Sequence, residues 1–506
     1  MDGWARVPTF LAAGVCALAL AWVQLSFPGL LDGDSQFHAR AAEQLRAHGV
    51  QSEFPQAAFS TWKDHYSDKD FLFHALTIPF VNDPADLAPG GKRAAILFGV
   101  LLCAILATSI ELLGLRFGPL WVVLALAAAP GAVEYLVLLR PHVLALALFP
   151  LELALLLTGR LGALATLAGL HVLTHSSFAF VPALPLAYAA ASWLHGRSLP
   201  WRSLAATVGG IAVASLLHPY FPNNLTLAWD QLVEVASNAW IRPVIDRDLM
   251  GPELYGMAPQ AIVLAFPAWL PAVAGIVWAV RRSPRADLSI RSLTLALVSV
   301  GFLALSLLSS RFFPLFVVHS ALLAGSLWTE LSQGWSWRRL AERGNAVPRA
   351  AALLLAVCGL AAVAQASVPG APARINSHRL PGVYRPAIAF LSRVAAPEEQ
   401  VYHSFWWPFA WLYFFRPEGR YVAGLDPIFL YRYDPRLFHR MLEAHRGRGD
   451  AYQIVARDFG ARWAFVEKLP RTQPLRNLLQ KDARFRRRYA DRFAEVYEVS
   501  TPQATP

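Results

Sequence analysis

The stretch that decides the fold is residues 7–40, VPTFLAAGVCALALAWVQLSFPGLLDGDSQFHAR. No charged residue occurs over 7–31, and a helix needs only about 20 apolar residues to cross the hydrocarbon core of a bilayer. The run ends in a polar segment that holds Asp32 and Asp34. The sequence therefore predicts a first transmembrane helix that delivers two carboxylates to the membrane surface.

The whole chain repeats this pattern of long uncharged windows. Of its 506 residues, 56% are hydrophobic and only 16% are charged, which excludes a single-domain soluble protein. The windows lie near 8–28, 94–113, 118–139, 141–158, 161–175, 177–194, 203–220, 259–280, 289–309, 312–329 and 350–368. The fold class predicted is a polytopic α-helical membrane protein with about 11 transmembrane helices, a number set by the length that spans a bilayer.

The distribution of Lys and Arg predicts the orientation. With a cytoplasmic amino terminus, the basic loops at 195–202, 281–291 and 335–349 all fall on the cytoplasmic side, as the positive-inside rule requires. The net charge of +11 is then a property of these loops, and nucleic acid is not an expected partner. Residues 29–93, 221–258 and the chain after 369 fall on the outer face.

The composition changes after the last window. Residues 1–368 form the predicted transmembrane domain, and residues 369–506 mix polar and aromatic residues. Strand-prone runs (QVYHSF, RYVAGL, RWAFVEK and AEVYEV) alternate there with helical ones (RPAIAFLSRVA and DPRLFHRMLEA). This alternation predicts a small outer-face α/β domain. The basic run ARFRRRYADR is interpreted as a solvated face.

Two acidic clusters in the first outer loop are the main candidates for chemistry. Asp32 and Asp34 form the first, and the second, DHYSDKDFLFH, contains Asp68 and Asp70. A helix dipole at the start of the amphipathic stretch FHARAAEQLRAHG accounts for one aspartate but not for both clusters. A carboxylate can instead act as a general base, and Asp34, Asp68 and Asp70 together could hold Mg²⁺ or Mn²⁺ beside a phosphate.

A departing phosphate also needs positive charge. The candidates for binding it are Arg40, Lys63, Arg140, His142, His175 and Arg311. For each arginine the alternative is snorkelling to the interface. His171 and His175 have the spacing of metal ligands on a helix, but without the glutamate of a zinc protease they favour polar packing or a phosphate contact.

At DSQFHAR the chain resembles the polytopic glycosyltransferases of the GT-C class, in particular the oligosaccharyltransferase catalytic subunit. By that resemblance Asp34 stands at the catalytic, metal-associated aspartate and Arg40 at the arginine that follows it. The stretch VYHSFWWPFAWLYFFRPEGRYVAGLDP is similar to the tryptophan-pair segment of the same family. Here Pro408 follows Trp406 and Trp407 where that family has an aspartate that helps to bind the acceptor peptide.

The resemblance implies an inverting glycosyltransferase that takes a sugar or glycan from a polyprenyl-phosphate-linked donor. The acceptor, a lipid, glycan or protein, is left open, as are the sugar and the use of a metal. Similar bacterial chains imply a multi-pass protein of the cytoplasmic (inner) membrane whose site faces the periplasm. The alternatives are a lipid-linked sugar flippase or another transporter, and a scaffold without activity. The clustering of ionisable residues at one face, rather than at the bilayer midplane, favours the enzyme.

Overall fold

The computed structural model describes residues 6–231, 255–282, 288–333, 346–366, 368–373 and 382–500. By its internal contacts the chain divides into two compact units. The helical unit comprises Met1–Phe27, Ala95–Leu217 and Gly251–Ser377. The loop–sheet unit comprises Pro28–Ala94, His218–Met250 and His378–Pro506. Residues 29–93, the predicted first outer loop, thus fold with the C-terminal region, while the expected domain boundary at 368/369 stays a prediction. Most of the predicted second outer loop, 221–258, lies outside the described residues.

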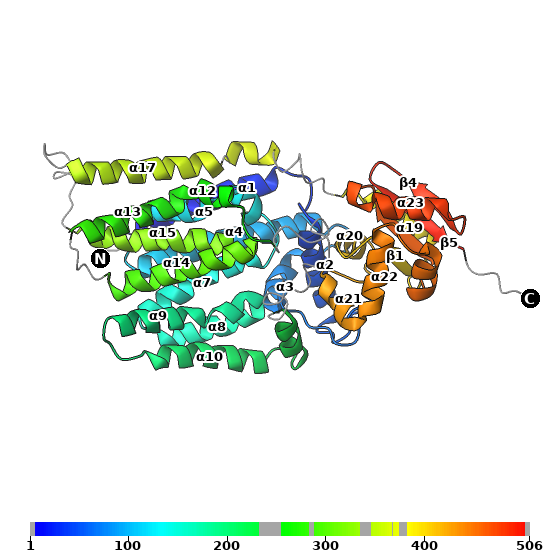
Figure 1. Ribbon diagram of the computed structural model, residues 1–506, viewed down its shortest axis with the longest axis horizontal. Helices are drawn as coiled ribbons and strands as arrows, with labels where there is room; N and C mark the ends of the chain where they lie inside the picture. The colour runs from blue at the N-terminus through cyan, green and yellow to red at the C-terminus, as the bar shows by residue number, and fades with distance from the viewer. Residues whose placement is uncertain are drawn as a thin grey trace, which may run out of the picture. The chain divides into compact units, whose positions relative to one another are not determined.

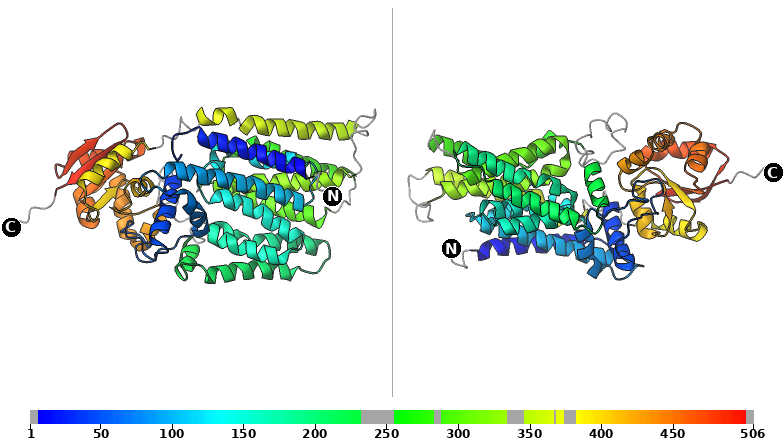
Figure 2. Two further views of the ribbon diagram at one scale, coloured as in Figure 1. Left: turned by 180° about the vertical axis from the view of Figure 1, so that it is seen from behind. Right: turned by 90° about the horizontal axis from the view of Figure 1, so that it is seen from below.

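The helical unit is a set of helices that run side by side (Figures 1 and 2). In chain order they are α1 (Val7–Leu25), α4 (Ala88–Leu112, whose first turns belong to the other unit), α5 (Gly118–Ala127), α6 (Ala132–Leu136), α7 (His142–Leu157), α8 (Leu161–Thr174), α9 (Ala183–Leu194), α10 (Trp201–Leu216), α12 (Pro259–Leu264), α13 (Phe266–Arg282), α14 (Ile290–Leu308), α15 (Phe313–Leu331) and α17 (Ala346–Ala366). Short 3₁₀ turns η3 (Ser176–Phe180), η6 (Ser310–Phe312) and η7 (Val368–Gly370) adjoin them.

Each predicted window coincides with a helix or a pair of helices. Among the described residues, six helical segments are long and apolar enough to cross a membrane. The other windows contain shorter apolar helices. The window at 118–139 is divided between α5, which ends at Ala127, and α6, whose N-cap is Gly131 with a φ of 71°. The protein is therefore a mostly helical, polytopic membrane protein, and the count of about 11 spans stays a prediction.

Small residues allow close packing between α8 and α10. A Cβ atom on Gly210 would lie 2.0 Å from the carbonyl oxygen of Ala165, and one on Gly169 would lie 3.1 Å from the carbonyl oxygen of Gly210. Helices within a membrane associate through such backbone contacts because lipid offers no hydrophobic driving force between them.

The loop–sheet unit contains a five-stranded mixed sheet in the order β2-β1-β3-β5-β4. Its strands are β1 (Gln400–His403), β2 (Arg420–Tyr421), β3 (Trp463–Glu467), β4 (Phe485–Ala490) and β5 (Ala494–Val499). β1 is parallel to β2 and β3, whereas β5 is antiparallel to β3 and β4. The four strand-prone runs are confirmed as β1, β2, β3 and β5, and the basic run forms the edge strand β4. The predicted alternation of strands and helices after residue 369 is thus confirmed, and the structure arranges the strands as a small mixed sheet.

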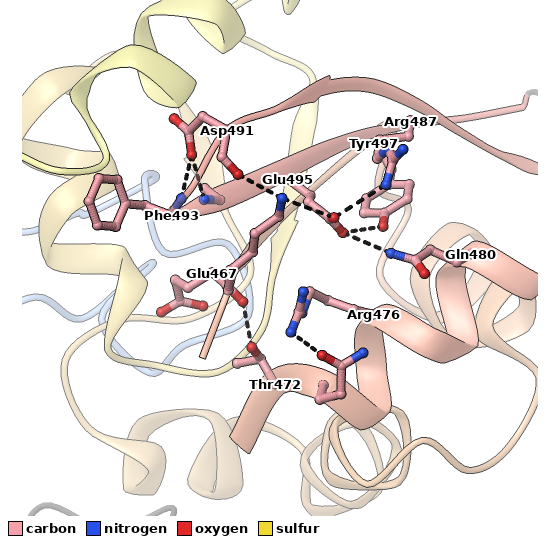
Figure 3. Close-up of polar contacts among 12 residues, drawn as sticks. Glu467, Thr472, Arg476, Gln480, Arg487, Asp491, Phe493, Glu495 and Tyr497 are labelled. Atoms are coloured by element: carbon pink, nitrogen blue, oxygen red, sulfur yellow. Dashed lines mark hydrogen bonds and ion pairs between the residues drawn. The ribbon is translucent and has the colours of Figure 1, made fainter. Parts of the chain in front are cut away.

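Helices and a buried polar network complete this part. The helices are α19 (Arg385–Val394), α20 (Pro408–Phe415), α21 (Pro427–Tyr433), α22 (Pro435–His445), the π-helix η8 (Gln453–Asp458), η9 (Pro470–Thr472) and α23 (Gln473–Lys481). Glu495 on β5 is 2% exposed and accepts hydrogen bonds from Tyr497, Gln480 and Arg487 (Figure 3). The buried carboxylate is therefore satisfied by donors from β4, β5 and α23.

The first outer loop extends this sheet. The backbone N–H groups of Ala58 and Phe59 donate to the carbonyls of Tyr421 and Val422, both at 2.9 Å. The rest of the loop, with α2 (Gly33–His48), α3 (Phe71–Thr77) and η2 (Ile78–Phe80), packs through aromatic side chains. Among these contacts, Phe37 lies 5.7 Å from Tyr413 between ring centroids. The acidic loop is therefore a fixed part of the loop–sheet unit.

Candidate active site

The first acidic cluster begins helix α2. Asp32 is its N-cap, and its carboxylate accepts the backbone N–H of Ser35 at 3.0 Å. Asp34 stands in the first turn and is half-buried. Asp32 therefore serves as the helix cap, whereas Asp34 does not.

The second cluster builds a hydrogen-bonded chain that reaches α2. Asp68 accepts the Asp70 backbone N–H at 3.0 Å through Oδ1, and its Oδ2 lies 2.6 Å from Nδ1 of His74. Nε2 of His74 lies 2.8 Å from Nδ1 of His38 on α2. All three side chains are buried, with 5%, 1% and 8% exposure for Asp68, His74 and His38. The structure thus joins the two acidic clusters through two histidines that the sequence analysis did not select.

A repeated pattern in the sequence could have found them. The segments DSQFH (34–38) and DFLFH (70–74) both read Asp-x-x-Phe-His, and each begins a helix. The two copies pack against each other, since the His38 ring contacts Phe73 at 5.3 Å and the His74 ring contacts Phe37 at 6.4 Å. Sequence alone gives the repeat but not the pairing, because the copies are separated by a loop whose path is set by the sheet.

The surroundings shift the pKa of two groups in this cluster, Asp70 and His74. The pKa of Asp70 is raised to about 6, chiefly by burial and also by the carboxylates of Asp68 and Asp34, while Lys69 and His74 oppose the shift. Burial by itself lowers the pKa of His74, but the charge and hydrogen bond of Asp68 outweigh it, so this pKa lies above the usual value.

The Asp70 shift predicts a pH-dependent change in stability. The folded protein binds the Asp70 proton more tightly than the unfolded chain, so the free energy of unfolding falls as the pH rises from about 4 through 6, by roughly 3 kcal/mol. Asp70→Asn should therefore raise the melting temperature at pH 7.5 and raise it less at pH 4.5. Asp64→Asn, at an exposed site in the same loop, is the control. An equal shift at both pH values would contradict a buried, ionising Asp70.

The expected metal set of Asp34, Asp68 and Asp70 does not fit the geometry. Both carboxylate oxygens of Asp68 already accept hydrogen bonds, from the Asp70 backbone and from His74. Within the part of the chain that the structure describes, no three His, Cys, Asp or Glu side chains are grouped as a metal site would require. Asp68 belongs to the histidine chain, and no step is assigned to a cation here.

The two cations proposed in this loop, Arg40 and Lys63, have different surroundings. Arg40 is 7% exposed; its Nε and Nη2 donate to the Phe414 carbonyl at 3.1 and 2.8 Å, and it also donates to Pro84 and Glu43. These bonds tie α2 to α20. Lys63 is exposed. Arg40 therefore has a structural explanation that needs no phosphate.

The four candidates in the helical unit lie at one end of it. His142 begins α7 and His175 follows α8, and these two helices are antiparallel neighbours joined by a short link. Nε2 of His195, at the far end of α9, lies 2.7 Å from the carbonyl oxygen of Leu288, which places the start of α14 there. Since α14 starts at the far end of α9, its last turn and the following Arg311 lie at the opposite end, where His142 lies. Arg140 precedes His142 by two residues.

The η3 turn holds His175 in a polar network. His171 is fully buried, and its Nδ1 lies 2.9 Å from Glu152 Oε1 while its Nε2 lies 2.8 Å from Ser177 Oγ. The Ser177 backbone N–H donates to Nδ1 of His175 at 3.1 Å, so this nitrogen is an acceptor. A neutral His175 therefore carries its proton on Nε2. His171 and His175, which lie four positions apart in HVLTH, thus both take part in polar packing around Ser177.

The tryptophan pair is used in packing within the loop–sheet unit. The Trp407 indole N–H donates to the buried carboxylate of Glu467, and the Arg471 guanidinium lies 3.8 Å from the centre of its ring. Trp406 packs against Phe405 at 4.0 Å. With Pro408 starting α20, this segment has a structural role of its own.

Comparisons with known proteins agree on the fold. No family model matches the chain, and no curated protein matches it. Among solved structures, the apo oligosaccharyltransferase of Archaeoglobus fulgidus is 12% identical, with a TM-score of 0.62 over 91% of this chain and 69% of that one. ArnT from Cupriavidus metallidurans bound to undecaprenyl phosphate is 15% identical, with a TM-score of 0.57 over 98% of this chain and 99% of that one. A further structure of the archaeal enzyme contains zinc and sulfate.

Identities this low establish similarity of fold only. The similarity covers nearly the whole of ArnT, both the helices and the C-terminal sheet region of this chain. In fold, the chain is therefore similar to the polytopic GT-C glycosyltransferases, as the DSQFHAR resemblance predicted.

Proposed function

We propose that this protein is an inverting membrane glycosyltransferase that moves a sugar or glycan from a polyprenyl-phosphate-linked donor to an acceptor at the outer face of the bacterial cytoplasmic membrane. The observation that carries the proposal is the joined acidic loop, in which Asp34 lies in the first turn of α2 and His38 of the same helix ends the buried Asp68–His74–His38 chain. A fold shared with ArnT, whose structure holds undecaprenyl phosphate, supports the same donor class.

The reaction assigns one role to Asp34. The acceptor X–H forms a bond from X to the anomeric carbon, the carbon–oxygen bond to phosphate breaks, and the lipid leaves as its phosphate or pyrophosphate. The acceptor proton goes to the Asp34 carboxylate, which acts as a general base. Asp32 supports it by fixing the start of α2. Polyprenyl-phosphate-linked donor and membrane lipids are the proposed partners.

The cations at one end of the helical unit are proposed to bind the donor phosphate. Arg140→Ala and Arg311→Ala should each weaken binding of a polyprenyl-phosphate sugar roughly tenfold or more, because a charge-assisted hydrogen bond is lost. Folding should change little, since Arg311 is exposed and Arg140 is half-buried. Arg202→Ala, an exposed arginine at the opposite end of the unit, is the matched control.

The deciding assay incubates the purified protein with polyprenyl monophosphate- and pyrophosphate-linked sugars and analyses the lipid by mass spectrometry. Release of polyprenyl phosphate or pyrophosphate without its sugar supports transfer and identifies the donor. Movement of intact lipid-linked sugar across a vesicle bilayer without release would replace the transferase with a flippase. Absence of binding to any polyprenyl carrier by folded protein would contradict both functions.

A further inference from the structure

Two half-buried aromatic side chains of the loop–sheet unit adjoin the start of helix α2. Trp411 lies on α20 and Tyr384 is the N-cap of α19, and their rings meet edge to face with 5.5 Å between centroids. A Cβ atom on Gly33 would lie 3.0 Å from Nε1 of Trp411 and 3.2 Å from Cβ of Ala410. Gly33 directly precedes Asp34, so the N–H edge of the indole lies beside the residue proposed as the general base.

The polar ends of both side chains are left unused by the protein. Within the described part of the chain, no hydrogen bond joins the Trp411 indole N–H or the Tyr384 hydroxyl to another residue, and neither atom is fully buried. Tryptophan and tyrosine side chains that are buried usually have such a partner. Burial, and after it the charge of Glu467, raises the pKa of the Tyr384 hydroxyl, so this group keeps its proton at neutral pH.

The neighbouring Trp407 shows what a structural tryptophan looks like in this unit. Its indole N–H donates to the buried Glu467, and the Arg471 guanidinium covers its ring at 3.8 Å from the centre. Trp411 follows Trp407 by four positions on α20, yet its N–H has no acceptor among the described residues. Packing therefore accounts for the polar edge of Trp407 but not for that of Trp411.

The close contact with Gly33 separates Trp411 from an aromatic side chain that merely anchors a protein at the membrane interface. Gly33 is the first residue of α2, and its φ is not positive, so its backbone conformation does not require glycine. Glycine is needed there for space, because a larger residue would press on the indole. An interface anchor has no such need for a fixed position against the backbone beside Asp34.

An aromatic surface with N–H and O–H donors at its edge suits a sugar ring. A sugar presents a face of C–H groups, which packs on an aromatic ring, and a rim of hydroxyls, which accept hydrogen bonds. In the proposed reaction the donor always supplies a sugar, whereas the acceptor is a lipid, glycan or protein. The acceptor attacks the anomeric carbon of that sugar and gives its proton to Asp34, so the transferred sugar must lie near this carboxylate.

We propose that Trp411 and Tyr384 form the platform on which the transferred sugar of the polyprenyl-phosphate-linked donor binds. Gly33 is a positioning residue, which lets the Trp411 indole approach the start of α2. The inference rests on the proposed function and deepens it, because it assigns residues to the sugar of the donor rather than to its phosphate. These two aromatic residues then contribute to the choice of sugar.

The test compares lipids that differ only in the sugar. The affinity of the full-length protein in detergent is measured for undecaprenyl phosphate and for a panel of undecaprenyl-phosphate-linked hexoses and pentoses. The ratio of the two dissociation constants gives the contribution of the sugar. Wild type should bind at least one member of the panel more tightly than the bare lipid. Trp411→Ala should lower this ratio roughly tenfold and leave the affinity for undecaprenyl phosphate unchanged.

Graded variants separate ring packing from hydrogen bonding. Trp411→Phe keeps an apolar ring without the N–H, and Tyr384→Phe removes only the hydroxyl, so each should lower the ratio severalfold, the effect of one neutral hydrogen bond. Gly33→Ala removes no polar group, but its Cβ displaces the indole and should lower the ratio as well. Trp229→Ala, at a tryptophan of the same unit that is 65% exposed, is the control and should change neither affinity.

The remaining outcomes distinguish this inference from the proposed function. Equal weakening of both lipids by Trp411→Ala would make Trp411 a structural or anchoring residue and overturn the inference, as would an unchanged ratio. An unchanged ratio with a raised KM for the acceptor would move the platform to the acceptor. If Trp411→Ala does not fold, the ratios for Trp411→Phe and Tyr384→Phe decide in the same way. Wild type that binds undecaprenyl phosphate but prefers no sugar would overturn the inference alone, and failure to bind any polyprenyl carrier would overturn both.

Discussion

Asp34→Asn is expected to reduce sugar transfer by about a hundredfold or more, the usual contribution of a positioned general base. The amide keeps the shape of the side chain and removes its ability to accept a proton. The start of α2 should remain intact, because Asp32 supplies the cap and not Asp34. The measurement is the rate of transfer at saturating donor and acceptor, with melting temperature as the check on folding.

Asp32→Asn provides the matched control two residues earlier, at the N-cap of the same helix. Asparagine is as good an N-cap as aspartate, so this variant should fold normally and lose much less activity. Asp32→Ala should instead lower stability by about 1 kcal/mol. If Asp34→Asn turned over within a few-fold of wild type while Asp32→Asn was inactive, the base would be Asp32.

Arg40→Ala should produce the largest loss of stability in the first outer loop, about 3–5 kcal/mol. The substitution leaves Glu43, itself 4% exposed, without its closest cation at 3.0 Å, and leaves the Phe414 carbonyl without two donors. Unfolding in detergent and protease resistance of the loop–sheet unit would measure the effect. Arg46→Ala is the control, because Arg46 contacts the same glutamate at 3.7 Å with a more exposed side chain.

The same experiment decides between two roles for Arg40. If Arg40 is structural, the Arg40→Ala protein should be less stable, and any loss of sugar transfer should follow from its unfolding. An Arg40→Ala protein of normal melting temperature that no longer binds polyprenyl phosphate would instead restore Arg40 to the phosphate site predicted from its place in DSQFHAR.

The amino-acid sequence alone determined the features that depend on local chemistry. Long uncharged windows fix membrane helices because a bilayer offers no hydrogen bonds to an unfolded backbone, so each window contains helix in the structure. Alternating strand-prone and amphipathic runs located four strands and helices α19 and α22. The strand β4 was missed because its three consecutive arginines, Arg486 to Arg488, read as solvated surface. Charged side chains on an edge strand are also a common protection against pairing with other chains.

Only the tertiary structure decided which polar residues meet. Asp32 and Asp34 look alike in sequence, yet one caps a helix and the other does not, because capping depends on backbone geometry at a single residue. The structural role of Arg40 depends on its hydrogen bond to the carbonyl of Phe414, which lies 374 positions further along the chain. His38 and His74, 36 positions apart, became a hydrogen-bonded pair because residues 58 and 59 join the C-terminal sheet and set the path of the loop between them. Periodicity and composition report what each residue needs locally, whereas a pairing of distant side chains depends on the packing of the whole unit.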